Sequence, residues 1–142
     1  MIAIGSDHGG YNLKLEIMKH LEEKEIAYRD YGCLNSEACD YPVYGKAVAK
    51  AVAQGECEQG IVICTTGIGI SIAANKIRGI RAALCTDSLT ARLTRLHNDA
   101  NVLALGAGIV GPELAKAIVD TFLETKFSGL ERHSRRISLI EE

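Results

Sequence analysis

The sequence has no apolar run that approaches the roughly 18 residues needed to span a membrane, so we expect no membrane-spanning helix. It opens with MIAIGSDHGG, which has no basic segment and runs at once into acid and glycine, unlike a secretory signal. An excess of one charge is also absent, since the net charge is only -2. The chain therefore has no general attraction for nucleic acid or anionic membranes, and any phosphate site must be a local arrangement.

Paired cysteines are missing as well. The five cysteines are an odd number and none forms a C-x-x-C pair, which argues against a disulfide framework and against a zinc site. They indicate a reducing compartment, so we expect a cytoplasmic protein. No cluster of His, Asp and Glu has the spacing of zinc or magnesium ligands, and we expect neither a metal nor a cofactor.

What the sequence does contain is an alternation of short apolar runs with longer amphipathic stretches. The apolar runs predict strands at 2–5, 26–30, 60–64, 81–85 and 102–106. The amphipathic stretches predict helices at 11–24, 42–53, 71–76, 88–97 and 112–125, with a C-terminal helical tail at 131–140. Five strand–helix units in succession predict a single-domain α/β fold over residues 1–142, with a five-stranded parallel sheet and helices on both faces. We expect the flavodoxin-like or Rossmann-like strand order 2-1-3-4-5.

This strand order places a topological switch point between the first and third strands. Ligands of such sheets bind there, outside the carboxyl ends of the strands. The two loops that open at this point, 6–10 and 65–69, are also the most unusual stretches of the sequence. The sequence therefore predicts the functional site between them.

Cys64 ends the third strand, and Thr66-Gly67-Ile68-Gly69 leads directly into a helix. Backbone N–H groups in a glycine turn at a helix N-terminus form a cradle for an anion, and the same positive end favours the thiolate form of a nearby cysteine. Such a thiolate can remove a proton alpha to a carbonyl while the amides hold the enediolate. The alternative is that Cys64 merely fills the strand.

The glycines also permit a dinucleotide interpretation. Gly67-Ile68-Gly69 begins a G-x-G-x-x-G pattern, and Asp87 follows the next strand where a ribose-binding acid belongs. However, Ile72 occupies the third glycine position, and the pattern follows the third strand. Asp87 is more simply the cap of the helix that starts at residue 88.

Polar side chains follow the first two strands at the same edge. His8 has the chemistry to bind a phosphate, and Asp7 that to bind a sugar hydroxyl, although Asp7 in a turn also caps the following helix. Tyr41, which precedes Pro42 at a predicted helix start, has a ring and hydroxyl that suit a sugar; a partly buried aromatic is the alternative.

His97 stands at the end of a helix that has run back to the opposite edge of the sheet. Within one subunit it should lie far from Cys64, so a catalytic role would require it to enter a neighbouring subunit's site. The alternative is a cation placed favourably at a helix C-terminus. Arg132 and Arg136, four residues apart, share one helix face and either grip a phosphate or form a solvated basic face.

Five segments follow one another along the whole chain: Gly5-Ser6-Asp7-His8-Gly9-Gly10, Asp40-Tyr41-Pro42, Cys64-x-Thr66-Gly67-Ile68-Gly69-x-Ser71-Ile72-Ala73-Ala74-Asn75-Lys76, His97-Asn98-Asp99-Ala100-Asn101 and Arg132-His133-x-x-Arg136. In this order, they resemble the type B ribose-5-phosphate isomerases. The superfamily also contains isomerases of galactose 6-phosphate and allose 6-phosphate. The resemblance implies a flavodoxin-like homodimer or dimer of dimers with sites shared between subunits, acting on ribose 5-phosphate and ribulose 5-phosphate in the pentose phosphate pathway.

The resemblance also implies a role for each site residue. Cys64 would move the proton between C1 and C2, and Thr66 and His97 would assist opening of the furanose ring. The enediolate would be held by the backbone amides of the segment 67–71, with Gly67, Ile68, Gly69 and Ser71 as site residues. The sugar would be contacted by Asp7, Tyr41 and Asn98, and the phosphate by His8, Arg132 and Arg136.

Three positions depart from the family pattern. Thr65 replaces the usual glycine after the cysteine, Val43 stands where an acid often follows Asp-Tyr-Pro, and Gly108 stands where many members have a phosphate-binding arginine. A six-carbon sugar phosphate therefore remains an alternative substrate. A non-catalytic phosphosugar-binding or nucleotide-binding module on the same fold is the alternative of another class.

Overall fold

The strands of the computed structural model, which describes residues 1–142, all pair in parallel. They are β1 (Ile2–Ser6), β2 (Tyr28–Asp30), β3 (Gln59–Cys64), β4 (Ala82–Leu84) and β5 (Val102–Gly106). Every residue of β1 and β5 is buried, as is β3 after its first residue. Strands that are apolar throughout belong in the middle of a sheet covered on both faces, and these three lie there.

The order of the strands is β2-β1-β3-β5-β4, so the predicted order 2-1-3-4-5 is wrong for the last two strands. β5 lies beside β3, and β4 forms the edge. The physical reason lies in their sequences: β5 is a continuous apolar run of five residues, which suits the covered middle of the sheet, whereas β4 has only three residues and stays partly exposed at the edge. The α/β class, the parallel pairing and the switch point between β1 and β3 are confirmed.

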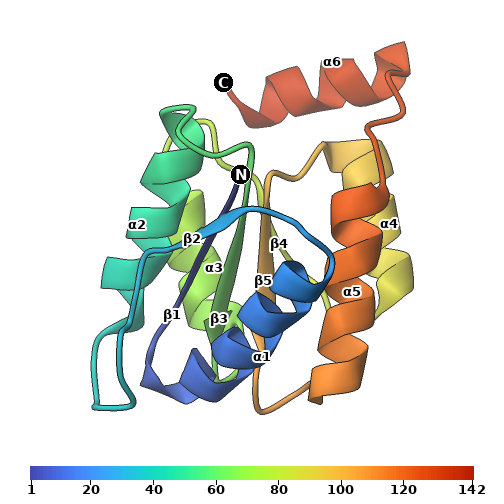
Figure 1. The fold of residues 1–142 in the computed structure, drawn as a ribbon. Coiled ribbons are helices and arrows are strands. Elements are labelled where there is room, and N and C mark those ends of the chain that lie inside the picture. Colours follow the sequence, from blue (N-terminus) through green and yellow to red (C-terminus); the bar gives the residue numbers. More distant parts are fainter.

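Helices cover both faces of the sheet (Figure 1). One face carries α1 (Tyr11–Glu23), α4 (Ser88–Asn98) and α5 (Pro112–Glu124), and the other carries α2 (Tyr41–Ala53) and α3 (Ile68–Asn75). Side chains of each inner strand alternate between the two faces: Ile61 and Ile63 join the α1–α5 cluster, and Val62 and Cys64 the α2–α3 cluster. The strand alternation therefore points the Cys64 side chain toward α2 and α3.

Helix starts follow the local sequence. The Asp87 carboxylate accepts a hydrogen bond from the Thr90 amide at 2.7 Å, which confirms the predicted cap, and Pro42 and Pro112 lie in first turns. α3 begins at Ile68, three residues before the predicted start at 71, because Gly67 turns the chain with φ +77°. A short 3-10 turn, η1 (His8–Gly10), precedes α1.

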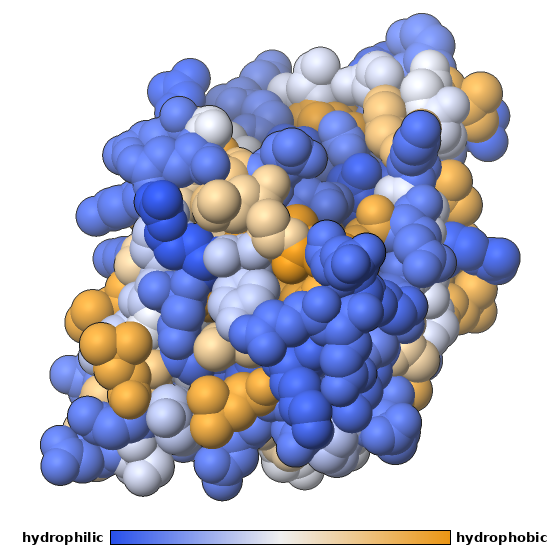
Figure 2. All heavy atoms as spheres, viewed as in Figure 1, coloured by the Kyte–Doolittle hydropathy of each residue, from blue (hydrophilic) through white to orange (hydrophobic).

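The ends of the strands define two edges of the sheet. We call the edge where the strands end the carboxyl edge and the opposite one the amino edge. The last helix, α6 (Glu131–Ile140), lies across the amino edge at the top of Figure 1. None of the helices has the length and apolar character needed to cross a membrane. Seen from the same side, polar residues predominate and apolar ones form small separate groups (Figure 2).

Candidate active site

A hollow of about 370 Å³ lies at the carboxyl edge, over the end of β3. The switch between β1 and β3 opens the sheet here, and α2 and α3 both begin beside it. Six of its lining residues are predicted site residues: Asp7, Tyr41, Cys64, Thr66, Ile68 and Gly69. The structure therefore brings together residues from three segments far apart in the sequence.

Cys64 is 5% exposed, and its sulfur accepts a hydrogen bond from the Gly67 amide at 3.1 Å. This contact requires the tight turn at Gly67. A Cβ atom there would lie 2.5 Å from Leu84 Cδ1 and 2.8 Å from the Leu105 carbonyl carbon, so only glycine fits. An N–H group that donates to sulfur stabilises negative charge on it.

The N-terminal amides of α3 divide into occupied and free ones. The Ile68 amide donates to Thr66 Oγ1 at 3.2 Å, and the Ser71 amide donates to the Gly67 carbonyl at 3.2 Å. The amides of Gly69 and Ile70 have no acceptor in the structure. Since the first N–H groups of a helix have no intrahelical partner, these two are available to an anion beside Cys64.

The predicted amide segment 67–71 is available to an anion only in part. The Ser71 hydroxyl donates to the Ile68 carbonyl at 2.7 Å, so its side chain is already engaged. Within the predicted amide segment 67–71, the free amides are those of Gly69 and Ile70. The start of α3 at residue 68 explains this, because the amides of the first helical turn have no acceptor within the helix.

The loop after β1 is held against the end of β3. The Asp7 carboxylate, 6% exposed, accepts a hydrogen bond from the Gly10 amide at 3.0 Å, and the Asp7 amide donates to the Ile63 carbonyl at 3.2 Å. His8 is exposed, and its Nδ1 accepts from the Cys39 amide at 3.2 Å. In the neutral ring this contact leaves Nε2 as the protonated nitrogen, a donor for a ligand.

Tyr41 opens α2 and reaches across to α3. A Cβ atom on Gly69 would lie 2.6 Å from Tyr41 Cζ and 2.9 Å from its hydroxyl oxygen, so the ring packs directly on the glycine. The side chain nevertheless keeps 40% of its surface exposed. Tyr41 therefore forms a wall of the hollow and presents its hydroxyl beside the free Gly69 amide.

A buried lysine supports the loop that carries these residues. Lys14 on α1 is fully buried, and its Nζ donates to the Asp30 carboxylate at 2.8 and 3.0 Å and to the Cys33 carbonyl. This contact fixes the start of the loop that continues to Cys39, whose amide binds His8. This contact was not predictable from the sequence, in which Lys14 is one of several polar residues of an amphipathic helix.

The other predicted catalytic residue lies elsewhere. His97, near the end of α4, is at the amino edge, and its ring centroid is 4.6 Å from that of His133 on α6. The next residue, Asn98, accepts a hydrogen bond through its carbonyl oxygen from Arg81 Nε at 2.8 Å, and Arg81 directly precedes β4. The predicted separation of His97 from Cys64 within one chain is confirmed.

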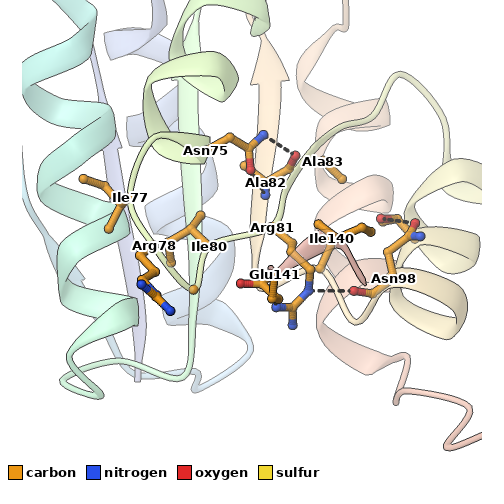
Figure 3. A pocket seen from close by; sticks show the side chains of 13 residues that line it. Asn75, Ile77, Arg78, Ile80, Arg81, Ala82, Ala83, Asn98, Ile140 and Glu141 are labelled. Carbon is orange, nitrogen blue, oxygen red and sulfur yellow. Dashed lines mark hydrogen bonds and ion pairs between the residues drawn. The ribbon is translucent and has the colours of Figure 1, made fainter. Parts of the chain in front are cut away.

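Asn98 also borders a cavity of about 550 Å³ at the amino edge, between the end of α3, the start of β4 and the end of α6 (Figure 3). Arg81 crosses this cavity and pairs with Glu141 at 2.9 Å, which ties α6 to the body of the protein. Asn98 Oδ1 accepts from the Thr94 hydroxyl at 3.1 Å, so its amide nitrogen stays free.

Arg132 and Arg136 lie exposed on α6, beside His97 and His133. Neither arginine forms an ion pair, whereas Arg135 on the same helix pairs with Glu131 at 3.1 Å. His133 is 7% exposed, and its Nδ1 lies 2.8 Å from the Ser128 hydroxyl. Burial lowers the pKa of His133, and the positive charges of the neighbouring basic side chains lower it further.

The dinucleotide interpretation loses its ribose-binding acid. The Asp87 carboxylate is engaged by the amide of Thr90, and this hydrogen bond lowers the pKa of Asp87. Fold and site together define an α/β protein with a buried thiol and free backbone amides at the switch point of its sheet. Such an arrangement suits transfer of a proton next to a carbonyl group.

Comparison with known proteins gives the family. Residues 2–140 match the Ribose/Galactose Isomerase family. Ribose-5-phosphate isomerase B of Escherichia coli (strain K12) is 52% identical over 139 residues, which cover 98% of this chain and 93% of that protein. The chain belongs to the Ribose/Galactose Isomerase family, and the predicted resemblance to the type B ribose-5-phosphate isomerases is confirmed.

Solved structures agree with this assignment. Ribose-5-phosphate isomerase B of Clostridium thermocellum has a TM-score of 0.97 at 56% identity, over 99% of this chain and 94% of that chain. The Mycoplasma genitalium ribose-5-phosphate isomerase B, solved with bound ribulose 5-phosphate, has a TM-score of 0.94 at 42% identity, over 99% and 93%.

Proposed function

We propose that this chain is an aldose–ketose isomerase that interconverts ribose 5-phosphate and ribulose 5-phosphate. The observation that carries the proposal is the Cys64 thiol, which is buried at the switch point. Its sulfur accepts a hydrogen bond from the Gly67 amide at 3.1 Å, and two amides of α3 beside it are free. A protein that only binds phosphosugars has no need of a base at this place. The same sugar phosphates occur in the name of the E. coli relative and in the M. genitalium complex.

In the proposed reaction, the Cys64 thiolate removes the proton from C2 of the open-chain aldose. The electron pair moves into a C1–C2 double bond, and the carbonyl oxygen becomes an enediolate oxygen. The free amides of Gly69 and Ile70 donate to that oxygen as its charge develops. Return of the proton from sulfur to C1, with transfer of the O2 proton to O1, gives the ketose; Asp7 and Tyr41 hold the sugar hydroxyls.

The sugar must be an open chain before this step, and its ring opening needs an acid–base pair. Thr66 lines the hollow, but its Oγ1 already accepts from the Ile68 amide, so it acts as a hydroxyl donor to the ring. We assign the other group of this acid–base pair to His97 of the partner subunit, because the chain's own His97 lies at the opposite edge of the sheet.

Two subunits arranged about a two-fold axis would bring the amino edge of one against the carboxyl edge of the other. Two exposed apolar side chains lie on α3: Ile68, which lines the hollow, is 53% exposed, and Ile72, four residues further along the helix, is 55% exposed. A homodimer, alone or in a dimer of dimers, would cover them. It would also deliver the partner subunit's Asn98 to the sugar, and the partner's Arg132 and the partner's Arg136 to the phosphate beside His8.

The proposed chemistry is supplied by a thiolate and by amide donors. We therefore expect a cytoplasmic enzyme of the pentose phosphate pathway that keeps its activity after dialysis against a strong chelator. A loss of activity that a divalent ion restores would contradict this mechanism.

An activity panel tests the substrate. We expect the purified protein to isomerise ribose 5-phosphate with a higher kcat/KM than allose 6-phosphate or galactose 6-phosphate. A preference for a six-carbon substrate would keep the reaction and move the substrate assignment. No isomerisation of any of the three, with retained binding of sugar phosphates, would contradict the enzyme and favour a binding module.

A further inference from the structure

Thr65 follows the proposed base directly, but its side chain points to another part of the site. In the extended chain at the end of β3, successive side chains point to opposite sides. Cys64 faces α2 and α3, and Thr65 faces the loops after β1 and β5, where it meets Gly9 and Gly108. Thr65 is exposed and also lines the hollow over Cys64.

The two glycines leave just enough space for this threonine. A Cβ atom on Gly108 would lie 3.1 Å from the Thr65 carbonyl oxygen and 3.2 Å from Thr65 Cγ2. A Cβ atom on Gly9 would contact Thr65 Oγ1 too closely, and would lie 3.4 Å from the Thr65 amide nitrogen. The Gly108 amide donates to the Thr65 carbonyl at 2.8 Å and fixes the pair. Two of the three departures from the family pattern, Thr65 and Gly108, are therefore in contact.

The groups around the Thr65 hydroxyl are mainly unsatisfied donors. The amides of His8, Gly9 and Thr65 have no acceptor in the structure, and the Thr65 hydroxyl makes no hydrogen bond within the chain. The Asp7 carboxylate, which also lies beside Gly9, already accepts a hydrogen bond from the Gly10 amide at 3.0 Å. Several free donors around one hydroxyl suit an oxyanion better than a neutral sugar hydroxyl.

We propose that Thr65 binds the phosphate group of the substrate through its hydroxyl, and that Gly108 is the residue that makes room for it. The proposal rests on the proposed function, since it uses the same site. A sugar phosphate with its reacting carbons at Cys64 must extend toward His8 if His8 takes the phosphate. Thr65 lies on that path, because it follows Cys64 directly in the chain and its side chain lies against Gly9, the neighbour of His8.

Thr65→Val tests the proposal, because valine keeps the shape of threonine and removes only the hydroxyl. A hydrogen bond to a charged group contributes enough to change affinity by about ten-fold or more. We expect Thr65→Val to raise the KM for ribose 5-phosphate by about ten-fold, with kcat within about three-fold of the wild type. Calorimetry with inorganic phosphate should show a similar loss of affinity, and Thr65→Ser, which keeps the hydroxyl, should recover most of it.

The outcomes separate the possible failures. An unchanged affinity of Thr65→Val for inorganic phosphate overturns the proposal, whether KM changes or not, because a change in KM alone would place the hydroxyl on the sugar. If Thr65→Val does not fold, Thr65→Ala answers the same question by the same calorimetry. If the wild-type protein binds phosphate but isomerises no sugar phosphate, the proposed function fails, and the phosphate measurement still decides the role of Thr65.

Discussion

The two edges of the sheet offer a ligand different chemistry. The carboxyl edge has a buried thiol, free backbone amides and a hollow of about 370 Å³, and none of the residues that line this hollow is Lys or Arg. The amino edge has a basic cluster of His97, Arg132 and Arg136, in which neither arginine has an acidic partner.

By this comparison, each edge holds only part of the chemistry that the proposed reaction of a sugar phosphate needs. The carboxyl edge has a base and donors for an enediolate, but lacks the guanidinium groups that bind a doubly charged phosphate best. The amino edge has those groups without a base. In the proposed homodimer, each site would combine the carboxyl edge of one subunit with the amino edge of its partner.

Removing the thiol should have the largest effect. We expect Cys64→Ala to lower kcat by at least about 10²–10⁴-fold, because general base catalysis contributes that much, while the dissociation constant for ribose 5-phosphate changes little. Cys57→Ala is the matched control, since Cys57 is buried in the same α2–α3 cluster and lies outside the hollow. Near-normal turnover of Cys64→Ala would contradict the proposed role of Cys64 as the base.

Neutralising the amino edge should affect binding more than turnover. We expect Arg132→Gln or Arg136→Gln to raise the KM for ribose 5-phosphate by about ten-fold or more, as for the loss of a charged hydrogen bond. Arg135→Gln is the control on the same helix, because Arg135 is already paired with Glu131 at 3.1 Å. Equal effects of all three variants would mean that α6 acts through its general charge alone.

A change in α4, which connects the two edges, should alter stability rather than chemistry. Asp87→Ala removes the N-terminal cap of α4, which lies at the carboxyl edge of the sheet, and should lower the free energy of unfolding by about 1 kcal/mol. Asp40→Ala is the comparison, since Asp40 precedes α2 without a side-chain cap bond and should cost much less. Denaturant titration measures both; equal losses would show that the Asp87 contact does not stabilise the helix.

The amino edge should also respond weakly to pH. The pKa of His133 is lowered in the folded state, so the unfolded chain takes up the proton more readily. The contribution of neutral His133 to the stability of the fold is therefore complete above the ordinary histidine pKa of about 6.5, and it is lost as the pH falls below that value. The free energy of unfolding, measured by denaturant titration between pH 8 and 5.5, should fall more steeply with falling pH for the wild type than for His133→Gln. Parallel pH dependences of the two proteins would contradict this.

Much of this arrangement followed from the sequence, and the exceptions have physical causes. The apolar runs predicted the strands and the class of fold, because burial on both faces leaves a continuous apolar signal. They did not predict that β5 lies beside β3 and β4 at the edge of the sheet, since that depends on which of the two strands is covered more completely on both faces. The sequence also did not show which amides of the segment 67–71 are free, because the glycine turn obscured the true start of α3.

The role of Lys14 and the contact between Thr65 and Gly108 depend on segments far apart in the chain. Periodicity reports which face of a helix is polar, and it does not report which polar residue will be enclosed by a loop from elsewhere. By contrast, the position of His97 was predictable, because a helix that follows a parallel strand must return to the opposite edge.

The most direct test of the shared site is complementation between two inactive variants, Cys64→Ala and His97→Ala. A mixed dimer holds one site with both groups intact and one with neither. Random assembly makes about half of the dimers mixed, so we expect recovery of about a quarter of the wild-type activity. Co-refolding the two variants and assaying ribose 5-phosphate isomerisation measures this. No recovery despite proven mixed dimers, or a fully active wild-type monomer, would contradict the account.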